Sequence, residues 1–245
     1  MPRIADTVTT ADGSCPVTLH TPGGDGPWPG VVLYPDAGGA RETFRTMADR
    51  LAGYGYAVLV PDVYYRDGDW APFEMATVFG DDAERRRLFG MIAKVTPDIM
   101  ASDATSLFDY LASRPEVGGE SFGTTGYCMG GRTSLVVAGR VPERVSAAMS
   151  FHGGGLASDD AGSPHLLAEK MRAAVYVGAA RNDRSFTVSN GDTLDKALSA
   201  AGVEHTIVWY PAEHGFAVPD NAPYDEAAAE QHWDAMQSFF GTHLR

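Results

Sequence analysis

The stretch Gly126-Tyr127-Cys128-Met129-Gly130 places a thiol between two glycines, and this pattern limits the possible folds more than any other feature. Residues 122–125 before it are typical of a buried strand, and residues 132–138 after it indicate a helix. A nucleophile between glycines at a strand-to-helix turn is the nucleophile-elbow pattern, with Cys where Ser is usual. The turn strains the central residue, and flanking glycines have no Cβ to collide with it. The following helix N-terminus favours a thiolate and an oxyanion at this point.

Strands and helices are predicted to alternate along the chain from residue 30 onward. Buried strands are expected at 30–34, 56–60, 122–125, 145–151, 173–179 and 204–210, and helices at 41–53, 97–113, 132–139, 164–172, 192–201 and 224–240. A hairpin over 5–10 and 16–21 precedes them. This alternation predicts a mostly parallel central sheet with helices on both faces, in a single α/β domain over residues 1–245. Residues 63–96 form an irregular excursion, typical of a lid or a pocket wall.

The charge balance and the cysteine count exclude several classes of protein. A net charge of −13 argues against a nucleic acid or an anionic membrane as partner, which leaves a small molecule. The N-terminal residues lack a signal pattern, and no apolar run reaches membrane-spanning length, so we expect a soluble cytoplasmic protein, monomeric or a small homo-oligomer. Two cysteines are weak support for an oxidising compartment. The chain has no nucleotide-binding glycine motif and no zinc-type spacing, so no cofactor or metal is expected.

Four residues with chemically useful side chains follow predicted strands: Asp36, Cys128, Asp183 and His214. In open parallel sheets the carboxyl ends of the strands meet at one edge, where chemistry collects. The chain order nucleophile, acid, histidine is the order of α/β-hydrolases, and it predicts a catalytic triad of Cys128, Asp183 and His214. Three alternatives stay open: an inert core cysteine at 128, an acid at Asp192 in place of Asp183, and another of the seven histidines.

With these motifs the sequence resembles the dienelactone hydrolase (carboxymethylenebutenolidase) family. The matching pieces are the elbow 126–131, Asp183 with Phe186, and His214-Gly215-Phe216-Ala217. The resemblance implies an α/β-hydrolase fold, a Cys–His–Asp triad, and an acidic residue after the first buried strand that touches the resting thiol, here Asp36. Known members carry Glu at that position. They also carry an Arg after the catalytic His that holds the substrate carboxylate, and Val218 stands there in this chain.

The predicted reaction is the hydrolysis of small esters or lactones through a thioester acyl-enzyme. His214, oriented by Asp183, would activate Cys128, and the backbone N–H groups of Ala37 and Met129 would hold the oxyanion. Two other classes of protein remain possible: a non-catalytic thiol redox sensor or small-molecule binder, and a Cys-dependent peptidase.

Five further residues are candidates for supporting the site or binding substrate: Asp36, Tyr64, Arg85, His152 and Phe216. Asp36 could instead cap the following helix, and Arg85 could belong to a solvated helix face with its neighbours. Tyr64 and Phe216 could equally be core residues. His152-Gly153-Gly154-Gly155 looks like a lipase oxyanion motif but follows the nucleophile, where that motif precedes it, so His152 is interpreted as pocket lining. The other cysteine, Cys15, is interpreted as a strand-packing or surface residue without a catalytic role.

Overall fold

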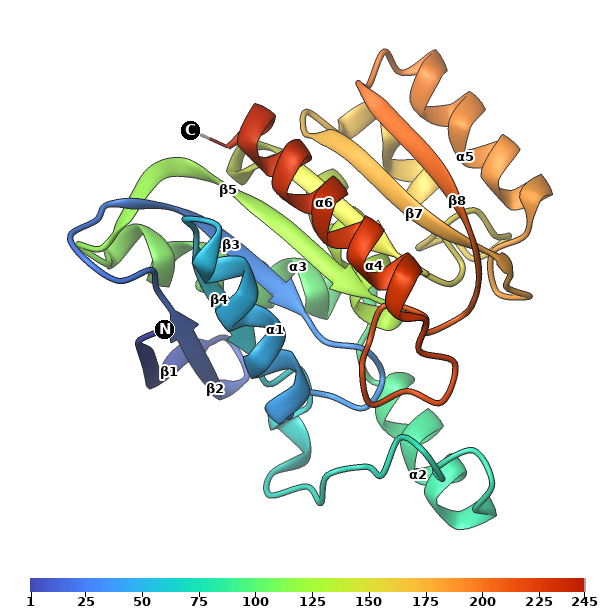
Figure 1. Cartoon of the computed structure of the whole chain (residues 1–245), viewed down its shortest axis with the longest axis horizontal. Helices are drawn as coiled ribbons and strands as arrows, with labels where there is room; N and C mark the ends of the chain where they lie inside the picture. Colours follow the sequence, from blue (N-terminus) through green and yellow to red (C-terminus); the bar gives the residue numbers. More distant parts are fainter. Residues whose placement is uncertain (245) are drawn as a thin grey trace.

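A computed structural model describes residues 1–244, and eight strands in this range form one sheet (Figure 1). Their spatial order is β1-β2-β4-β3-β5-β6-β7-β8. Pairing is antiparallel between β1 and β2 and between β2 and β4, and parallel in all the other pairs. The strands are β1 (Arg3–Thr10), β2 (Gly13–His20), β3 (Trp28–Tyr34), β4 (Ala57–Pro61), β5 (Val117–Tyr127), β6 (Val145–Phe151), β7 (Ala174–Asn182) and β8 (His205–Glu213).

Helices cover both faces of this sheet. The α-helices are α1 (Glu42–Gly53), α2 (Asp82–Ile92), α3 (Pro97–Ser113), α4 (Met129–Arg140), α5 (Val188–Ala200) and α6 (Glu226–His243), with a short 3₁₀ helix over Pro164–Lys170. Figure 1 shows α1 and α6 in front of the sheet and α3 and α4 behind it. Alternate residues of β3 divide the core, since Val31 packs with the α1 and α6 side and Val32 with the α3, α4 and α5 side. The predicted mostly parallel sheet with helices on both faces is therefore confirmed.

Several element boundaries differ from the sequence prediction, and the two largest differences are at the starts of α5 and β5. Helix α5 begins at Val188, four residues before the predicted start, because Thr187 and Asn190 form a reciprocal capping box that fixes its first turn. Strand β5 extends back to Val117 and pairs with β3 on either side of a register shift. The glycines at 118 and 119 hid this extension, because glycine weakens the pattern of a strand.

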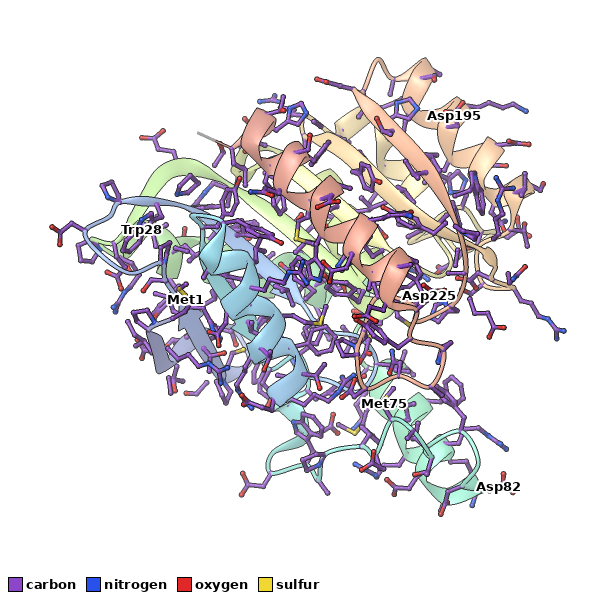
Figure 2. The ribbon with its side chains drawn as sticks, viewed as in Figure 1. Met1, Trp28, Met75, Asp82, Asp195 and Asp225 are labelled. Carbon is purple, nitrogen blue, oxygen red and sulfur yellow. The ribbon has the colours of Figure 1, made fainter. Side chains whose placement is uncertain are left out.

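The 63–96 excursion, named the α2 segment below, lies beyond the carboxyl ends of the central strands (Figure 1). It carries its own small apolar cluster, in which Tyr64, Phe73 and Leu88 pack with Ala37 of the turn after β3. Figure 2 places Met75 on the side of this segment that is nearest the body of the protein, and Asp82 at the outer end of the segment. Within residues 1–244, no helix combines the length and apolar character needed to cross a bilayer.

Candidate active site

The elbow at Cys128 is a strained turn held by close backbone contacts. Cys128 follows β5 directly and precedes α4, and its φ of 53° lies in the left-handed region that side chains rarely adopt. A Cβ on Gly126 would lie 2.2 Å from the carbonyl oxygen of Gly130, and a Cβ on Gly130 would lie 2.2 Å from that of Tyr34. Glycine is thus required at both positions, because the first turn of α4 packs directly on β5 and on the end of β3.

His214 and Asp183 are joined by a direct hydrogen bond. His214 follows β8 and Asp183 follows β7, and Nδ1 of the imidazole lies 2.7 Å from Oδ2 of the carboxylate. Ser185 fixes the acid, since its backbone N–H and its hydroxyl both donate to Oδ1 of Asp183, at 2.7 and 2.6 Å. Because an ionised carboxylate only accepts, Nδ1 of His214 carries the proton, and Nε2 is left for another partner.

The electrostatics of this pair also involve Cys128. Burial lowers the pKa of His214, but the hydrogen bond to Asp183 and the interaction with the Cys128 thiol outweigh burial and raise the pKa to about 10. Burial opposes the ionisation of Asp183, yet the hydrogen bonds from His214 and Ser185 keep the pKa of this carboxyl below its usual value. The imidazole therefore favours its protonated form between the Asp183 carboxylate and the Cys128 sulfur.

Two cavities meet at the thiol. The larger, of about 600 Å³, is lined by Cys128, His214, Ala37 and Phe79 together with Leu88, Phe89, Ile92, Met129, Arg132, Gly154, Asn182, Asp183, Arg184, Ser185 and Glu213. The smaller, of about 320 Å³, shares those first four residues and adds Asp36, Met75, Ala76, Gly215, Asn221, Ala222 and Pro223. Ala37 and Met129, whose N–H groups are the predicted oxyanion donors, both line the larger cavity. The site can therefore hold a molecule with a group on each side of the sulfur atom.

Comparison with known proteins identifies the family of the chain. Residues 16–244 match the Dienelactone hydrolase family over nearly the whole chain. The chain belongs to the dienelactone hydrolase family. A carboxymethylenebutenolidase of Rhodococcus opacus is 30% identical over 241 residues, which cover 95% of this chain and 88% of that protein. The fold is the α/β-hydrolase fold of this family, as the sequence predicted, and the chain is a hydrolase of the dienelactone hydrolase type.

Solved structures resemble the protein over its full length. P91, a dienelactone hydrolase-like promiscuous phosphotriesterase from metagenomic libraries, is 27% identical and has a TM-score of 0.79, with 100% of both chains covered. A dienelactone hydrolase from Anabaena variabilis shares the fold at 19% identity and a TM-score of 0.69, over 100% of this chain and 99% of that one.

Asp36 lines the smaller cavity of this family member, but its carboxylate is directed to other partners. Its oxygens accept hydrogen bonds from Gly38 N–H at 2.8 Å, from the Arg41 guanidinium at 2.6 and 3.0 Å, and from Asn221 at 3.2 Å. Arg41 in turn binds Asp220. Helix capping by Asp36 is wrong, because α1 begins only at Glu42 and Arg41 occupies its N-cap position. The carboxylate instead closes the turn that carries Ala37.

The other four supporting candidates do not line either cavity, so their interpretation as substrate contacts is corrected. Tyr64 is buried beneath the turn that carries Ala37, where its hydroxyl donates to the Ala37 carbonyl at 2.8 Å and lies 3.6 Å from Sδ of Met129. Phe216 is fully buried and stacks on Tyr210. Arg85 is on the outer face of α2, where it pairs with Asp82 at 2.7 Å.

His152 is also buried, behind His214. Val218, which stands at the position of the Arg implied by the family resemblance, is buried in the core between the sheet and α6, with no exposed surface.

Cys15 is buried in β2, so it is a strand-packing residue. Burial raises the pKa of its thiol to about 12, and both cysteines of the chain are free.

Sequence reasoning missed the apolar side chains of the α2 segment and two cations at the larger cavity. Phe79 and Phe89 are both 54% exposed, and with Leu88 they cover the cavity from the side opposite the sheet. Arg132 could have been found, because it lies four residues after Cys128 and so on the same helix face. Its guanidinium pairs with Asp160. Arg184 had no such signal, since it lies in a loop next to Asp183.

Proposed function

We propose that this hydrolase cleaves small neutral esters or lactones through a thioester on Cys128. The observation that supports this most strongly is the meeting of Cys128 with an Asp183-bound His214 between two cavities. A nucleophile, a base and an orienting acid on successive strand ends are the parts that acyl transfer requires. The elbow strain and the glycine contacts hold the sulfur in place before substrate arrives.

Before acylation the Cys128 proton passes to Nε2 of His214 and forms a thiolate–imidazolium pair, and in the acylation step the thiolate attacks the carbonyl carbon. The charge that develops on the carbonyl oxygen is stabilised by the N–H groups of Ala37 and Met129. The C–O bond of the ester then breaks, and the His214 imidazolium gives its proton to the departing alkoxide. In a lactone this alkoxide stays attached to the acyl chain.

In the deacylation step His214 takes a proton from water, and the resulting hydroxide attacks the thioester carbonyl. The C–S bond breaks, the acid product leaves, and the thiolate is regenerated beside the imidazolium. Asp183 stays ionised throughout and stabilises the imidazolium in both steps, because its hydrogen bonds favour the anion.

The lining of the cavities supports neutral substrates over carboxylate-bearing ones. Apolar side chains of the α2 segment form one wall, and Val218 is buried where family members carry a carboxylate-binding Arg. Each of the two arginines at the larger cavity has an acidic side chain that offsets its charge. Arg132 pairs with Asp160, and Arg184 shares the cavity with Glu213. A free carboxylate would therefore lose hydration without gaining a dedicated bidentate partner.

The proposal is tested with an activated aryl ester, assayed with the wild-type protein, Cys128→Ala, and the matched control Cys15→Ala. We expect Cys128→Ala to lose at least about 10³-fold in kcat, and Cys15→Ala to keep its activity if folded. Mass spectrometry of the quenched reaction should find the acyl group on the peptide that contains Cys128. Full activity in Cys128→Ala would refute the cysteine mechanism. Stoichiometric alkylation of Cys128 without turnover of any ester would favour a thiol sensor or binding protein.

A further inference from the structure

His152 directly follows β6, at the same edge of the sheet as the three triad residues. Its side chain is 1% exposed and it lines neither cavity, so it does not contact substrate from this position. Its ring centroid lies 5.1 Å from that of His214, with the two planes at 64°. The mechanism above gives this buried histidine no step.

The ring is enclosed by aromatic side chains. Besides His214, it packs against Phe216, with centroids 5.5 Å apart and planes at 71°, and against Tyr127 at 5.9 Å. Aromatic pairs at these separations and tilts are favourable contacts. On the side away from the cavities, His214 thus meets the ring of His152, which belongs to an aromatic cluster, rather than solvent.

Neither ring nitrogen of His152 has a hydrogen-bond partner among the described residues. Burial lowers the pKa of His152 well below its ordinary value, and the nearby His214 and His232 lower it further. The titratable groups that face it are His214 after β8, Tyr127 at the end of β5 and His232 on α6, and none is an acid that would favour its protonation. His152 is therefore an uncharged ring whose contacts are those of an aromatic surface.

The backbone explains why a histidine occupies a position that makes only ring contacts. The φ of His152 is 38°, in the left-handed region, and its N–H is fixed by a hydrogen bond to the carbonyl of Gly178 at 2.8 Å. Histidine, asparagine and aspartate enter this region several times more often than other side chains. Histidine is the one aromatic residue of that group, so it supplies a ring where phenylalanine would be strained.

We propose that His152 is a positioning residue whose uncharged ring holds His214 at the orientation that serves both Asp183 and Cys128. The hydrogen bond to Asp183 fixes one nitrogen of His214 but leaves the ring free to swing about that contact. The ring of His152 blocks the swing toward the sheet and keeps water from the buried side of the imidazole. The expected effect of His152 on ester turnover rests on the proposed function, whereas its expected effect on the alkylation of Cys128 does not.

The test compares His152→Asn, which suits the backbone but removes the ring, with His152→Phe, which restores an aromatic ring without nitrogens. His243→Asn, far along α6, controls for loss of a histidine. For each folded variant, kcat and KM are measured with the aryl ester, and the rate of Cys128 alkylation by iodoacetamide is measured against pH. We expect His152→Asn to lose about 10- to 100-fold in kcat with KM within about twofold, and His152→Phe to stay within about fivefold of wild type.

The alkylation profile separates a positioning role from a purely structural one. In His152→Asn the pH of half-maximal alkylation should move by more than about half a unit, because it follows the coupled ionisation of Cys128 and His214. Unchanged kcat and profile in His152→Asn would overturn the proposal, as would a His152→Phe variant that matches wild type in unfolding free energy but is as impaired as His152→Asn. If backbone strain destabilises His152→Phe or prevents its folding, His152→Gly replaces it, and wild-type behaviour there overturns the proposal too. Absence of ester turnover in the wild type would refute the proposed function, while the alkylation profiles would still test His152.

Discussion

The two sides of the substrate cavities are built in different ways. On the strand-end side, Cys128, Asp183 and His214 each directly follow a strand of the parallel sheet, and backbone packing that leaves no room for a Cβ at the elbow glycines fixes the turn. On the opposite side, the α2 segment presents half-exposed side chains such as Phe79 and Phe89, held by one small apolar cluster. The strand-end side therefore belongs to the packed core of the protein, whereas the α2 segment lies outside this core.

This difference indicates that the chemical step and the selection of substrate depend on different parts of this protein. Groups that exchange a proton need positions accurate to fractions of an ångström, which strand ends provide. A wall that only accommodates apolar groups tolerates variation, and loops outside the core change at small cost. We therefore expect substitutions on the strand-end side to change kcat, and substitutions in the α2 segment to change KM and substrate preference.

The largest effect is expected for Asp183→Asn. The amide can donate to Nδ1 of His214 and so favour the wrong tautomer, and it cannot stabilise the imidazolium. We expect kcat to fall by about 10³- to 10⁴-fold with KM within a few-fold, measured with the aryl ester. Asp192→Asn, on α5, is the matched control and should keep full activity. A loss of kcat below tenfold in Asp183→Asn would show that catalysis does not depend on the exact orientation of His214 by Asp183.

The second prediction concerns stability against pH. The pKa of His214 is raised to about 10 from an ordinary 6.5, so its protonated form stabilises the fold fully below about pH 6.5 and progressively less as the pH rises to about 10. Wild type should exceed His214→Gln in unfolding free energy by more at pH 6 than at pH 9.5. The change should be on the order of 1 kcal/mol, because the partly exposed ring is screened by solvent. Urea titrations at both pH values measure it, and an equal difference at both would contradict the raised pKa.

A third, smaller effect is expected where the two sides meet. Tyr64 belongs to the cluster of the α2 segment, yet its hydroxyl donates to the carbonyl of Ala37 and touches Met129. Tyr64→Phe removes the hydrogen bond that fixes the oxyanion turn, and kcat should fall about 3- to 10-fold with little change in KM. Tyr56→Phe, another buried tyrosine, is the control. A change in KM alone would assign Tyr64 to the substrate wall.

The smallest effect is expected at Phe89 in α2. Phe89→Ala removes apolar surface from the larger cavity, and KM for an ester with a bulky apolar group should rise about 3- to 10-fold while kcat stays within about twofold. Leu166→Ala, equally exposed but far from the cavities, should change neither value. A large loss of kcat in Phe89→Ala would mean that the α2 segment also organises the chemistry.

Much of the architecture could be predicted from the sequence, because its signals are local. The buried runs of β3, β4 and β6, and the glycines around Cys128, follow from side-chain periodicity and backbone sterics over a few residues. The order of Cys128, Asp183 and His214 along the chain indicated which strand ends carry chemistry. The early start of α5 at Val188 was missed because the capping box that sets it was not recognised.

The surroundings of those strand ends could not be predicted, because they depend on contacts between residues far apart in the chain. Asp36 has a carboxylate suited to a thiol partner, yet Asn221 and Arg41 take its oxygens. His152 has the side chain of a pocket residue, yet the aromatic cluster encloses it behind His214.

The sequence by itself therefore determined the fold class, the elbow and the edge of the sheet at which the chemistry lies. Only the tertiary structure decided which side chains face the cavities and which support them from behind. The physical reason is that periodicity and turn sterics act between near neighbours, whereas the direction and partners of a side chain at a loop depend on how distant segments pack around it.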